Sequence, residues 1–307
     1  MTKRVAFASF VFLWSITVFA QRTPDGHPDF QGFWSNGTAT PFQRPAEFAE
    51  KALFTPAEAA EYEHTALDRL VRSFPAEDRN AGDLNDTYLD THTLKVVDLR
   101  TSLIVDPPDG KLPPLLPAAQ ARNAARPRRS FDDPETLSLD ERCLLDTTFG
   151  SSNAAPPMVP NPFAQNYYQI VQTPSYVMIF TELVHDVRVI RINGTHLPSH
   201  IKLWLGDSIG HWEGNTLVVD TTNFSERTHF RGSGEHLHVV ERFTRPSPER
   251  IGYRATVDDP DTWTTSWSAD IPFKATSERM FEYACHEGNL SIENFMRGAR
   301  AEEKRQR

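Results

Sequence analysis

Ionisable residues inside predicted strands are the feature of this sequence that most suggests chemistry. The apolar stretch Val177–Ile190 carries Glu182, His185 and Asp186 in its second half. Burying such groups costs free energy unless they are paired or used in a reaction. We therefore expect a functional pocket within the β-rich region 168–288.

Other predicted strands also carry acids and bases at alternating positions. An acid beside a histidine or an arginine is what general acid–base catalysis requires, because each partner tunes the pKa of the other. We expect proton donors and acceptors among His185, Asp186, His238, Asp258, Glu282 and His286. Substrate binding is expected from Glu182, Arg242, Trp212, Trp263 and Tyr283, with the aromatic rings as walls.

Two orientations of these strands remain open at this point. Side chains alternate in direction along a strand, so 177–190 as one strand would place Glu182, Asp186 and Arg188 on one face. The opposite face would be nearly all apolar. The polar faces either point to water above an apolar core, or point into a barrel lumen and line a binding pocket.

A metal site is a further option. His236 and His238 have the two-residue spacing that places both on one strand face, although this spacing is common by chance. The sequence has no GxSxG elbow and no glycine-rich phosphate loop after a strand. We predict a metal-independent reaction without a cofactor.

The two cysteines, Cys143 and Cys285, are predicted to form a disulfide. The alternative is a reactive thiol or a metal ligand, because Cys285 is followed by His286 and Glu287.

The first twenty residues predict a signal peptide. Lys3 and Arg4 precede the apolar run Val5–Phe19, and Ala20 offers a cleavage site. The alternative, a membrane anchor, would need a longer span. We therefore expect a secreted or periplasmic protein that has no membrane association after cleavage.

The charge balance limits the partners. Without Lys3 and Arg4, 30 basic residues face 41 acidic ones. This excess of acid argues against nucleic acid and anionic membranes as partners. A small molecule remains as the expected substrate or ligand.

The N-terminal part, residues 21–150, predicts an irregular arm, a helix and a small strand pair. Phe30, Phe33 and Trp34 would pack the arm onto the main domain. Thr55 to Glu58 form a capping box that opens a helix to about Ser73. The strand pair is expected over 95–98 and 101–105, and a second, basic helix over 118–129.

Residues 151–290 predict an antiparallel, calycin-like β-barrel or a strongly curved sheet, which makes the chain mainly β. About eight short strands follow one another, with hairpin signals at Asn193-Gly194, at 213–215 and at 246–248, and the last strand is expected over 279–285. Closure would remove exposed strand edges. Residues 291–307 predict a C-terminal helix.

The sequence contains the motifs RTSLIVDPPDGKLPPL, ERCL, YQIVQTP, VHDVRVI, WEGNTLVVDTTNF, HLHVVERFTR, VDDPDTW and YACHEGN. Together they resemble a large family of secreted hypothetical proteins of soil bacteria, especially acidobacteria and some proteobacteria. The resemblance covers most of the chain after the signal and implies secretion from a bacterium. It carries over no catalytic residue. Asn215 stands where the family usually has Asp, which argues against that loop as an acid.

Two functional hypotheses follow. The first is a secreted enzyme that acts on a small organic or sugar-derived substrate by acid–base chemistry, as a lyase, an isomerase or cyclase, or a hydrolase. The second is a non-catalytic periplasmic barrel that binds an apolar or aromatic small molecule. The first expects the charged faces inside a pocket, whereas the second expects an apolar lumen.

Overall fold

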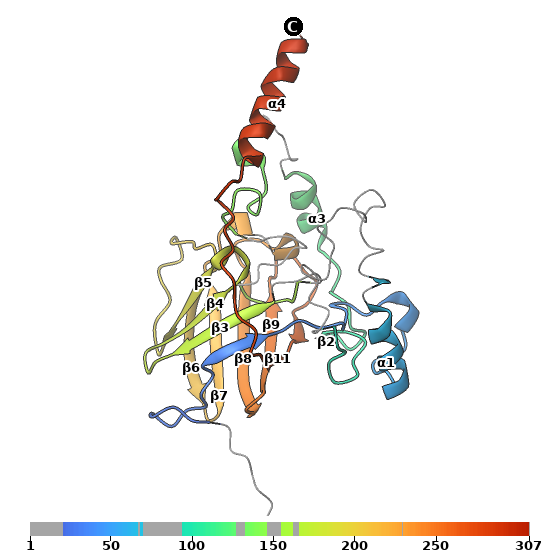
Figure 1. The fold of residues 1–307 in the computed structure, drawn as a ribbon, viewed down its shortest axis with the longest axis vertical. Coiled ribbons are helices and arrows are strands. Elements are labelled where there is room, and N and C mark those ends of the chain that lie inside the picture. The colour runs from blue at the N-terminus through green and yellow to red at the C-terminus, as the bar shows by residue number, and fades with distance from the viewer. Residues whose placement is uncertain are drawn as a thin grey trace, which may run out of the picture.

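The computed structural model describes residues 21–66, 68–69, 94–126, 133–145, 155–161, 166–228 and 230–306 (Figure 1). The predicted signal peptide lies outside the described residues, as do 70–73 and 127–129 at the ends of two predicted helices. The described α-helices are α1 (Pro56–His64), α3 (Pro117–Ala124) and α4 (Ser291–Arg305). Among the described residues, none of the helices combines the length and the hydropathy that a membrane span requires.

The predicted mainly β fold, with a barrel in the C-terminal half, is confirmed. The strands are β1 (Gly32–Ser35), β2 (Ile104–Asp106), β3 (Tyr167–Gln172), β4 (Tyr176–Thr181), β5 (Val187–Ile192), β6 (Asp207–Glu213), β7 (Thr216–Thr222), β8 (His238–Ser247), β9 (Arg250–Asp258), β10 (Trp267–Asp270) and β11 (Phe273–Ala275). Nine of them pair in the order β11-β1-β3-β4-β5-β6-β7-β8-β9, and β9 pairs with β11 to close the barrel. β10 and β2 extend the sheet from β9.

One strand pair departs from the predicted antiparallel pattern. β5 and β6 run parallel, with Ile190 opposite Ser208. The hairpin predicted at Asn193-Gly194 is therefore wrong. Parallel neighbours need a crossover connection, and residues 193–206 supply it. The hairpins predicted at 213–215 and 246–248 do join β6 to β7 and β8 to β9.

The N-terminal segment takes part in the barrel. β1 lies between β11 and β3, so the segment predicted as an irregular arm contributes a barrel strand. Phe30 and Trp34 are buried as predicted, whereas Phe33 is 42% exposed. The small strand pair predicted over 95–98 and 101–105 is wrong, because β2 pairs with β10.

The three predicted helices are present, but α1 ends at His64 and α3 at Ala124, before their predicted ends. Thr55 accepts from the backbone N–H of Glu58, whose carboxylate accepts from the N–H of Thr55, so the capping box opens α1 as expected. α4 has the predicted position and extends away from the barrel, as the red helix in Figure 1.

The stretch 177–190 is two strands, not one. β4 ends at Thr181 and β5 begins at Val187, with a turn between them in which Val184 and His185 adopt left-handed backbone angles (φ 58° and 48°). The turn reverses the chain and changes which residues of β5 face the barrel interior. As a result Arg188 is buried, whereas Val187 and Val189 are about half exposed (50% and 45%).

The C-terminal segment is held by the predicted disulfide. Cys143 and Cys285 are bonded, with their Cα atoms 5.7 Å apart, and the bond closes a loop of 142 residues. The strand predicted over 279–285 is wrong, since this segment is extended coil. The apolar residues at its alternating positions are not buried against the barrel, and Phe281 is 74% exposed.

The barrel lumen is filled by side chains. The inward positions of each strand form one hydrophobic cluster, which includes Trp34 on β1, Ile179 on β4, Val219 on β7 and Phe243 on β8. Successive inward residues are separated by one outward residue, as the strand period requires.

One ion pair lies within this apolar interior. Arg188 and Glu241 are 1% and 0% exposed and form a two-pronged contact, in which one guanidinium N–H lies 2.9 Å from Oε1. Ser208 and Thr221 accept further hydrogen bonds from Arg188. The hydroxyl of Tyr253 donates to Glu241 at 2.8 Å. These partners compensate for the desolvation of the two charges.

Breaking this pair is predicted to destabilise the barrel strongly. E241L leaves the guanidinium of Arg188 buried without a counter-charge, which costs about 3–5 kcal/mol of unfolding free energy. The double variant R188M/E241L removes both charges and should recover most of that loss. Urea denaturation followed by tryptophan fluorescence measures both.

E213L is the matched control, because Glu213 at the end of β6 forms an exposed ion pair with Arg242 of β8, on the far side of β7. It should change the unfolding free energy little, because exposed ion pairs contribute little to stability. The account of the core is contradicted if E241L is no more destabilising than E213L, or if the double variant is as unstable as E241L.

Candidate active site

The predicted site residues do not converge in the barrel lumen. His238, Arg242 and Asp258 occupy outward positions of β8 and β9, and their side chains reach solvent. Of the two orientations left open by the sequence, the polar faces therefore point outward. The break at 182–186 and the coil at 279–285 separate the remaining candidates from these strands.

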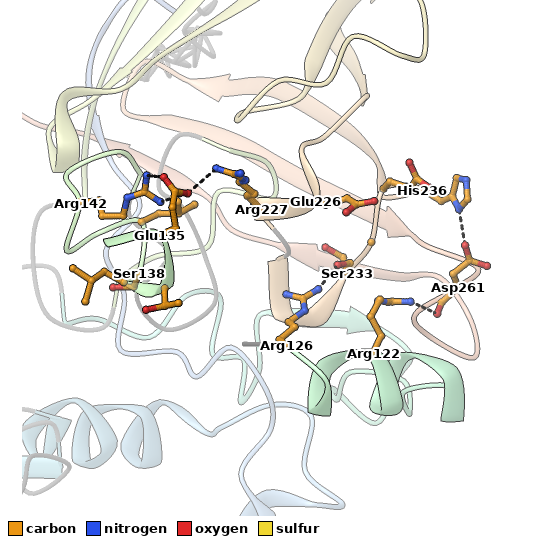
Figure 2. A pocket seen from close by; sticks show the side chains of 15 residues that line it. Arg122, Arg126, Glu135, Ser138, Arg142, Glu226, Arg227, Ser233, His236 and Asp261 are labelled. Atoms are coloured by element: carbon orange, nitrogen blue, oxygen red, sulfur yellow. Dashed lines mark hydrogen bonds and ion pairs between the residues drawn. The ribbon is translucent and has the colours of Figure 1, made fainter. Parts of the chain in front are cut away.

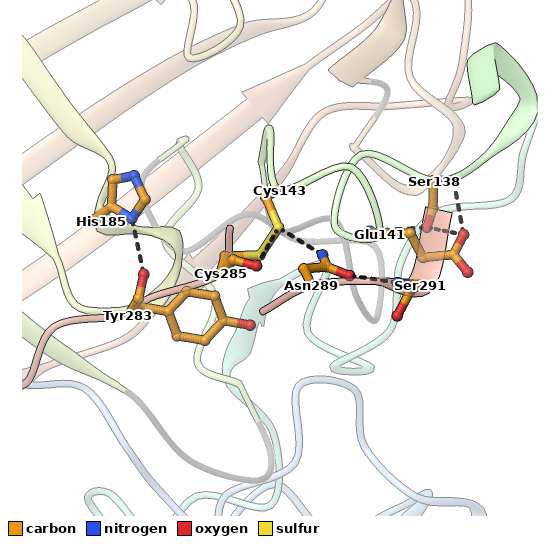
Figure 3. Close-up of a disulfide and its surroundings, with 8 residues drawn as sticks. All are labelled: Ser138, Glu141, Cys143, His185, Tyr283, Cys285, Asn289 and Ser291. Carbon is orange, nitrogen blue, oxygen red and sulfur yellow. Dashed lines mark hydrogen bonds between the residues drawn. A yellow bond between two sulfur atoms is a disulfide. The ribbon is translucent and has the colours of Figure 1, made fainter. Parts of the chain in front are cut away.

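One group of predicted residues lies beside the disulfide (Figure 3). The ring of His185 contacts the carbonyl oxygen of Tyr283 at 3.2 Å, and the buried carboxylate of Glu182 accepts the N–H of Phe281 at 2.9 Å. These contacts fasten the C-terminal segment to the β4–β5 turn. Asp186 lies in the same turn, where its carbonyl oxygen accepts from Thr181.

Glu282 and His286 belong to the same segment and are exposed. The group at the disulfide thus joins two parts of the chain and encloses neither of the described cavities.

The predicted binding residues are dispersed. Arg242 pairs with Glu213 at 2.7 Å on the barrel surface. Trp212 stacks on His27 with ring centroids 4.3 Å apart, and Trp263 is buried against Trp267. Both tryptophans therefore pack against other rings of the protein.

A different set of side chains does converge, on the outer face of β6, β7 and β8. The crossover 193–206 lays His196 over outward residues of β6 and β7. One ring nitrogen of His196 lies 3.0 Å from Asp207, and the other lies 3.0 Å from Asp220. The second oxygen of Asp220 lies 3.0 Å from Nε2 of His238.

The register of the sheet produces this alignment. Asp207 pairs with Thr222 across β6–β7, and Asp220 pairs with Val240 across β7–β8. Asp220 and His238 both point outward, and they are diagonal neighbours on adjacent strands, a separation that long polar side chains can bridge.

Asp207 is the buried end of this hydrogen-bonded series of side chains. It is 1% exposed and accepts from Arg191 at 2.8 Å and from the backbone N–H of Leu197 at 2.8 Å. Burial alone would raise the pKa of Asp207, but these hydrogen bonds and that of His196 outweigh it and lower the pKa. Asp207 is therefore an ionised structural anchor that fixes the crossover loop.

Asp220 and His238 form the partly exposed end of this hydrogen-bonded series of side chains. The hydrogen bond with Asp220 raises the pKa of His238, and the charges of Asp220 and Asp258 act in the same direction. The hydrogen bond with His238 lowers the pKa of Asp220 in turn. Nδ1 of His238 has no hydrogen-bond partner among the described residues, so it can exchange a proton with a bound molecule.

His238 lines a surface cavity of about 610 Å³, shared with side chains from the crossover loop and from the segment before β8. Ser199, His200 and Lys202 come from the loop, and Glu235 and His236 from the segment. A cavity of this size suits a small organic molecule. We call it the His238 cavity.

His236 and His238 do not share a metal-binding face. His236 precedes β8 and pairs with Asp261, whereas His238 pairs with Asp220. Within the described part of the chain, no group of three or more histidine, cysteine, aspartate or glutamate side chains is placed to hold a metal ion.

The sequence pointed to His238 but missed Asp220, Asp207 and His196. Asp220 carries a usable signal, because it is the one charged residue of β7 and follows three apolar residues at an outward position. His196 and Asp207 carry none, since their contacts depend on the parallel β5–β6 pair and its crossover.

Comparison with protein-family models, with curated proteins and with solved structures finds no match to this chain. The chemistry of the site is therefore inferred from its own side chains.

The Asp220–His238 pair is predicted to make stability depend on pH. The raised pKa of His238 gives stability that is complete below about 6.5 and is lost as the pH rises through the folded value. The lowered pKa of Asp220 gives stability that is present above 3.8 and is lost as the pH falls through its folded value. The pair thus stabilises the folded protein most between about pH 3.8 and pH 6.5.

Accordingly, D220N should lose most stability relative to the wild type at pH 5–6 and progressively less towards pH 9. The side chains are 38% and 35% exposed, so the largest difference should be only about 1 kcal/mol. Urea denaturation across this pH range measures it. In an H238N background this dependence above pH 6 should be much weaker. A difference that instead grows from pH 6 to 9 contradicts the assignment.

Proposed function

We propose that the protein is an enzyme that acts on a small organic or sugar-derived molecule by general acid–base chemistry, with His238 as the catalytic residue. The observation that carries the proposal is the alignment of His238 by Asp220 at the edge of a cavity, with no partner for Nδ1 in the described part of the chain. A histidine held by a carboxylate is a common means of setting the tautomer and basicity of the ring.

The geometry assigns a role to each nitrogen of His238. In the neutral ring, Nε2–H donates to Asp220 and Nδ1 is free to accept a proton from the substrate. In the protonated ring, Nδ1–H can return that proton to a leaving group or to another atom on the same face of the substrate. The raised pKa makes the ring of His238 a stronger base than a free imidazole.

Two further residues assist in this proposal. His196 bonds the other oxygen of Asp220 and so fixes the carboxylate plane, which makes it a positioning residue. Lys202 lines the same cavity, and its ammonium group can stabilise negative charge that develops when a proton is removed beside a carbonyl. Proton abstraction with charge stabilisation is the chemistry of lyases and isomerases, and a hydrolase would use the same base on water.

The alternative function, a barrel that holds an apolar ligand in its lumen, has less support. The inward side chains of the barrel pack against one another in a single cluster, and the polar network of Arg188 and Glu241 lies among them. The two cavities described here lie outside the barrel.

The Cys143–Cys285 bond supports the proposed secretion, because disulfides persist in oxidising compartments. The predicted signal peptide points to the same destination. We propose that the mature protein works outside the cytoplasm on a small molecule, and the sequence resemblance to secreted bacterial proteins agrees with this.

The test begins with a search for proton exchange. The protein is incubated in D2O with pools of sugar-derived acids, lactones and other small carbonyl compounds, and mass spectrometry identifies any compound that gains deuterium or is converted. For a compound found in this way, H238N should lower the rate by about 100-fold or more. D220N should lower it less and shift the pH profile.

H211N is the matched control, because His211 also pairs with a carboxylate, that of Glu213, but lies outside the His238 cavity. It should leave the rate unchanged. Turnover that survives H238N would rule out His238 as the catalytic residue.

A further inference from the structure

A second cavity, of about 770 Å³, adjoins the first. It lies between the end of α3, the segment 135–142 and the segment 226–236, and it shares Glu235 and His236 with the His238 cavity (Figure 2). We call it the arginine cavity, because four arginines line it.

Two of these arginines have only neutral hydrogen-bond partners. Arg122 donates to the carbonyl oxygen of Gly232 at 3.1 Å and to the hydroxyl of Thr262 at 2.8 Å. Arg126 donates to the carbonyl oxygen of Ser233 at 3.1 Å. Within the part of the chain that the structure describes, neither forms an ion pair with a carboxylate.

Most of the other charges of the cavity are paired. Glu135 bonds both Arg142 and Arg227 on one side, and Asp261 pairs with His236 on the other (Figure 2). Arg122 of α3 and Arg126, just beyond the end of α3, lie between these groups. Among the described residues they are the two arginines of the cavity that form no ion pair, although Glu226 lies near enough to act on Arg126.

The electrostatics of Arg126 reflect this arrangement. Burial lowers the pKa of Arg126, and the neighbouring charge of Arg122 lowers it further, while Glu226 acts in the opposite direction. An anion placed against the two guanidinium groups would relieve both the desolvation and the repulsion.

The remaining lining suits an organic anion. Leu137 and Leu139 add apolar surface. Ser233 is fully buried at the cavity wall, and its hydroxyl has no hydrogen-bond partner among the residues that the structure describes. An unused hydroxyl beside two guanidinium groups adds donor capacity for an anionic oxygen.

We propose that the arginine cavity binds the carboxylate group of an organic acid, with Arg126 as its main ligand and Arg122 beside it. A single negative charge fits better than a phosphate dianion, because Glu135, Glu226, Glu235 and Asp261 also line the cavity and would repel a second charge. Arginine suits a planar carboxylate through two parallel hydrogen bonds.

The arginine cavity indicates a substrate class for the enzyme. This inference rests on the proposed function. The two cavities meet at Glu235 and His236. An organic acid anchored at Arg126 would extend along this shared wall towards His238, so the substrate would be a carboxylic acid with its reactive carbon away from the carboxylate.

The test measures binding of 4-fluorobenzoate by ¹⁹F NMR, with 4-fluorobenzamide as the neutral counterpart and 4-fluorophenyl phosphate as the dianion. The wild type should bind the benzoate saturably and more tightly than either of the others. R126Q should weaken benzoate binding by about tenfold or more, because it removes charge-assisted hydrogen bonds. R254Q is the control, since Arg254 forms an exposed pair with Asp270 on the barrel.

E226Q provides a second test of opposite sign. Glu226 is exposed, and its charge opposes an anion at Arg126, so its removal should tighten benzoate binding by a few-fold. A gain of affinity does not arise from loss of folding.

The proposal is overturned by absence of saturable benzoate binding to the wild type at concentrations up to tens of millimolar. It is also overturned if R126Q binds as the wild type does, if the benzamide binds equally well, or if the phosphate binds more tightly. H238N should lose turnover and keep benzoate binding. Turnover that survives H238N overturns the catalytic proposal alone, whereas R126Q that binds benzoate as the wild type does overturns the arginine-cavity proposal alone.

Discussion

The closed barrel and its filled interior are the constraint on which the rest of the structure depends. Each strand has one inward face, and those faces pack into a single apolar cluster around the Arg188–Glu241 pair. A buried charge pair of this kind holds the strands in register, because a slip by one residue would place both charges outside and their outward neighbours inside. Since the interior is occupied, polar chemistry is left to the outer surface.

The outer surface acquires its site through one irregularity of the sheet. The parallel β5–β6 pair requires the chain to return along the barrel, and the returning segment carries His196. The result is a row of alternating charges and rings from Arg191 through Asp207, His196 and Asp220 to His238. The buried end of the row fixes geometry, and the partly exposed end borders a cavity. Rigid support behind an accessible base is what preorganised catalysis needs.

Local sequence patterns predicted the regular half of the fold. The strands from 207 to 258 alternate clearly between inward apolar and outward polar residues, and their short turns identify antiparallel hairpins. The prediction was wrong where backbone geometry breaks a pattern without a glycine or proline. Val184 and His185 reverse the chain with left-handed angles, which moved Arg188 into the core and sent Val187 and Val189 outside.

The site was only partly visible in the sequence for a related reason. His238 could be selected because its residue type and strand position suggested chemistry. Its partner Asp220 depends on the β7–β8 register, and His196 depends on a long-range parallel pairing, which neighbouring residues do not encode. His185, Glu182 and Tyr283 were selected from a pattern of polar residues, and the structure places them where the C-terminal segment is fastened beside the disulfide.

We infer that Asp220 holds His238 in one tautomer with a raised pKa and leaves Nδ1 without a partner among the described residues. Long-range ¹H–¹⁵N NMR of the histidine rings between pH 5 and 9, in the wild type and in D220N, is the decisive measurement. We expect His238 to titrate above the ordinary value of 6.5, to carry its proton on Nε2 when neutral, and to shift back towards 6.5 in D220N. A His238 ring that titrates at or below 6.5, or that is unaffected by D220N, would contradict it.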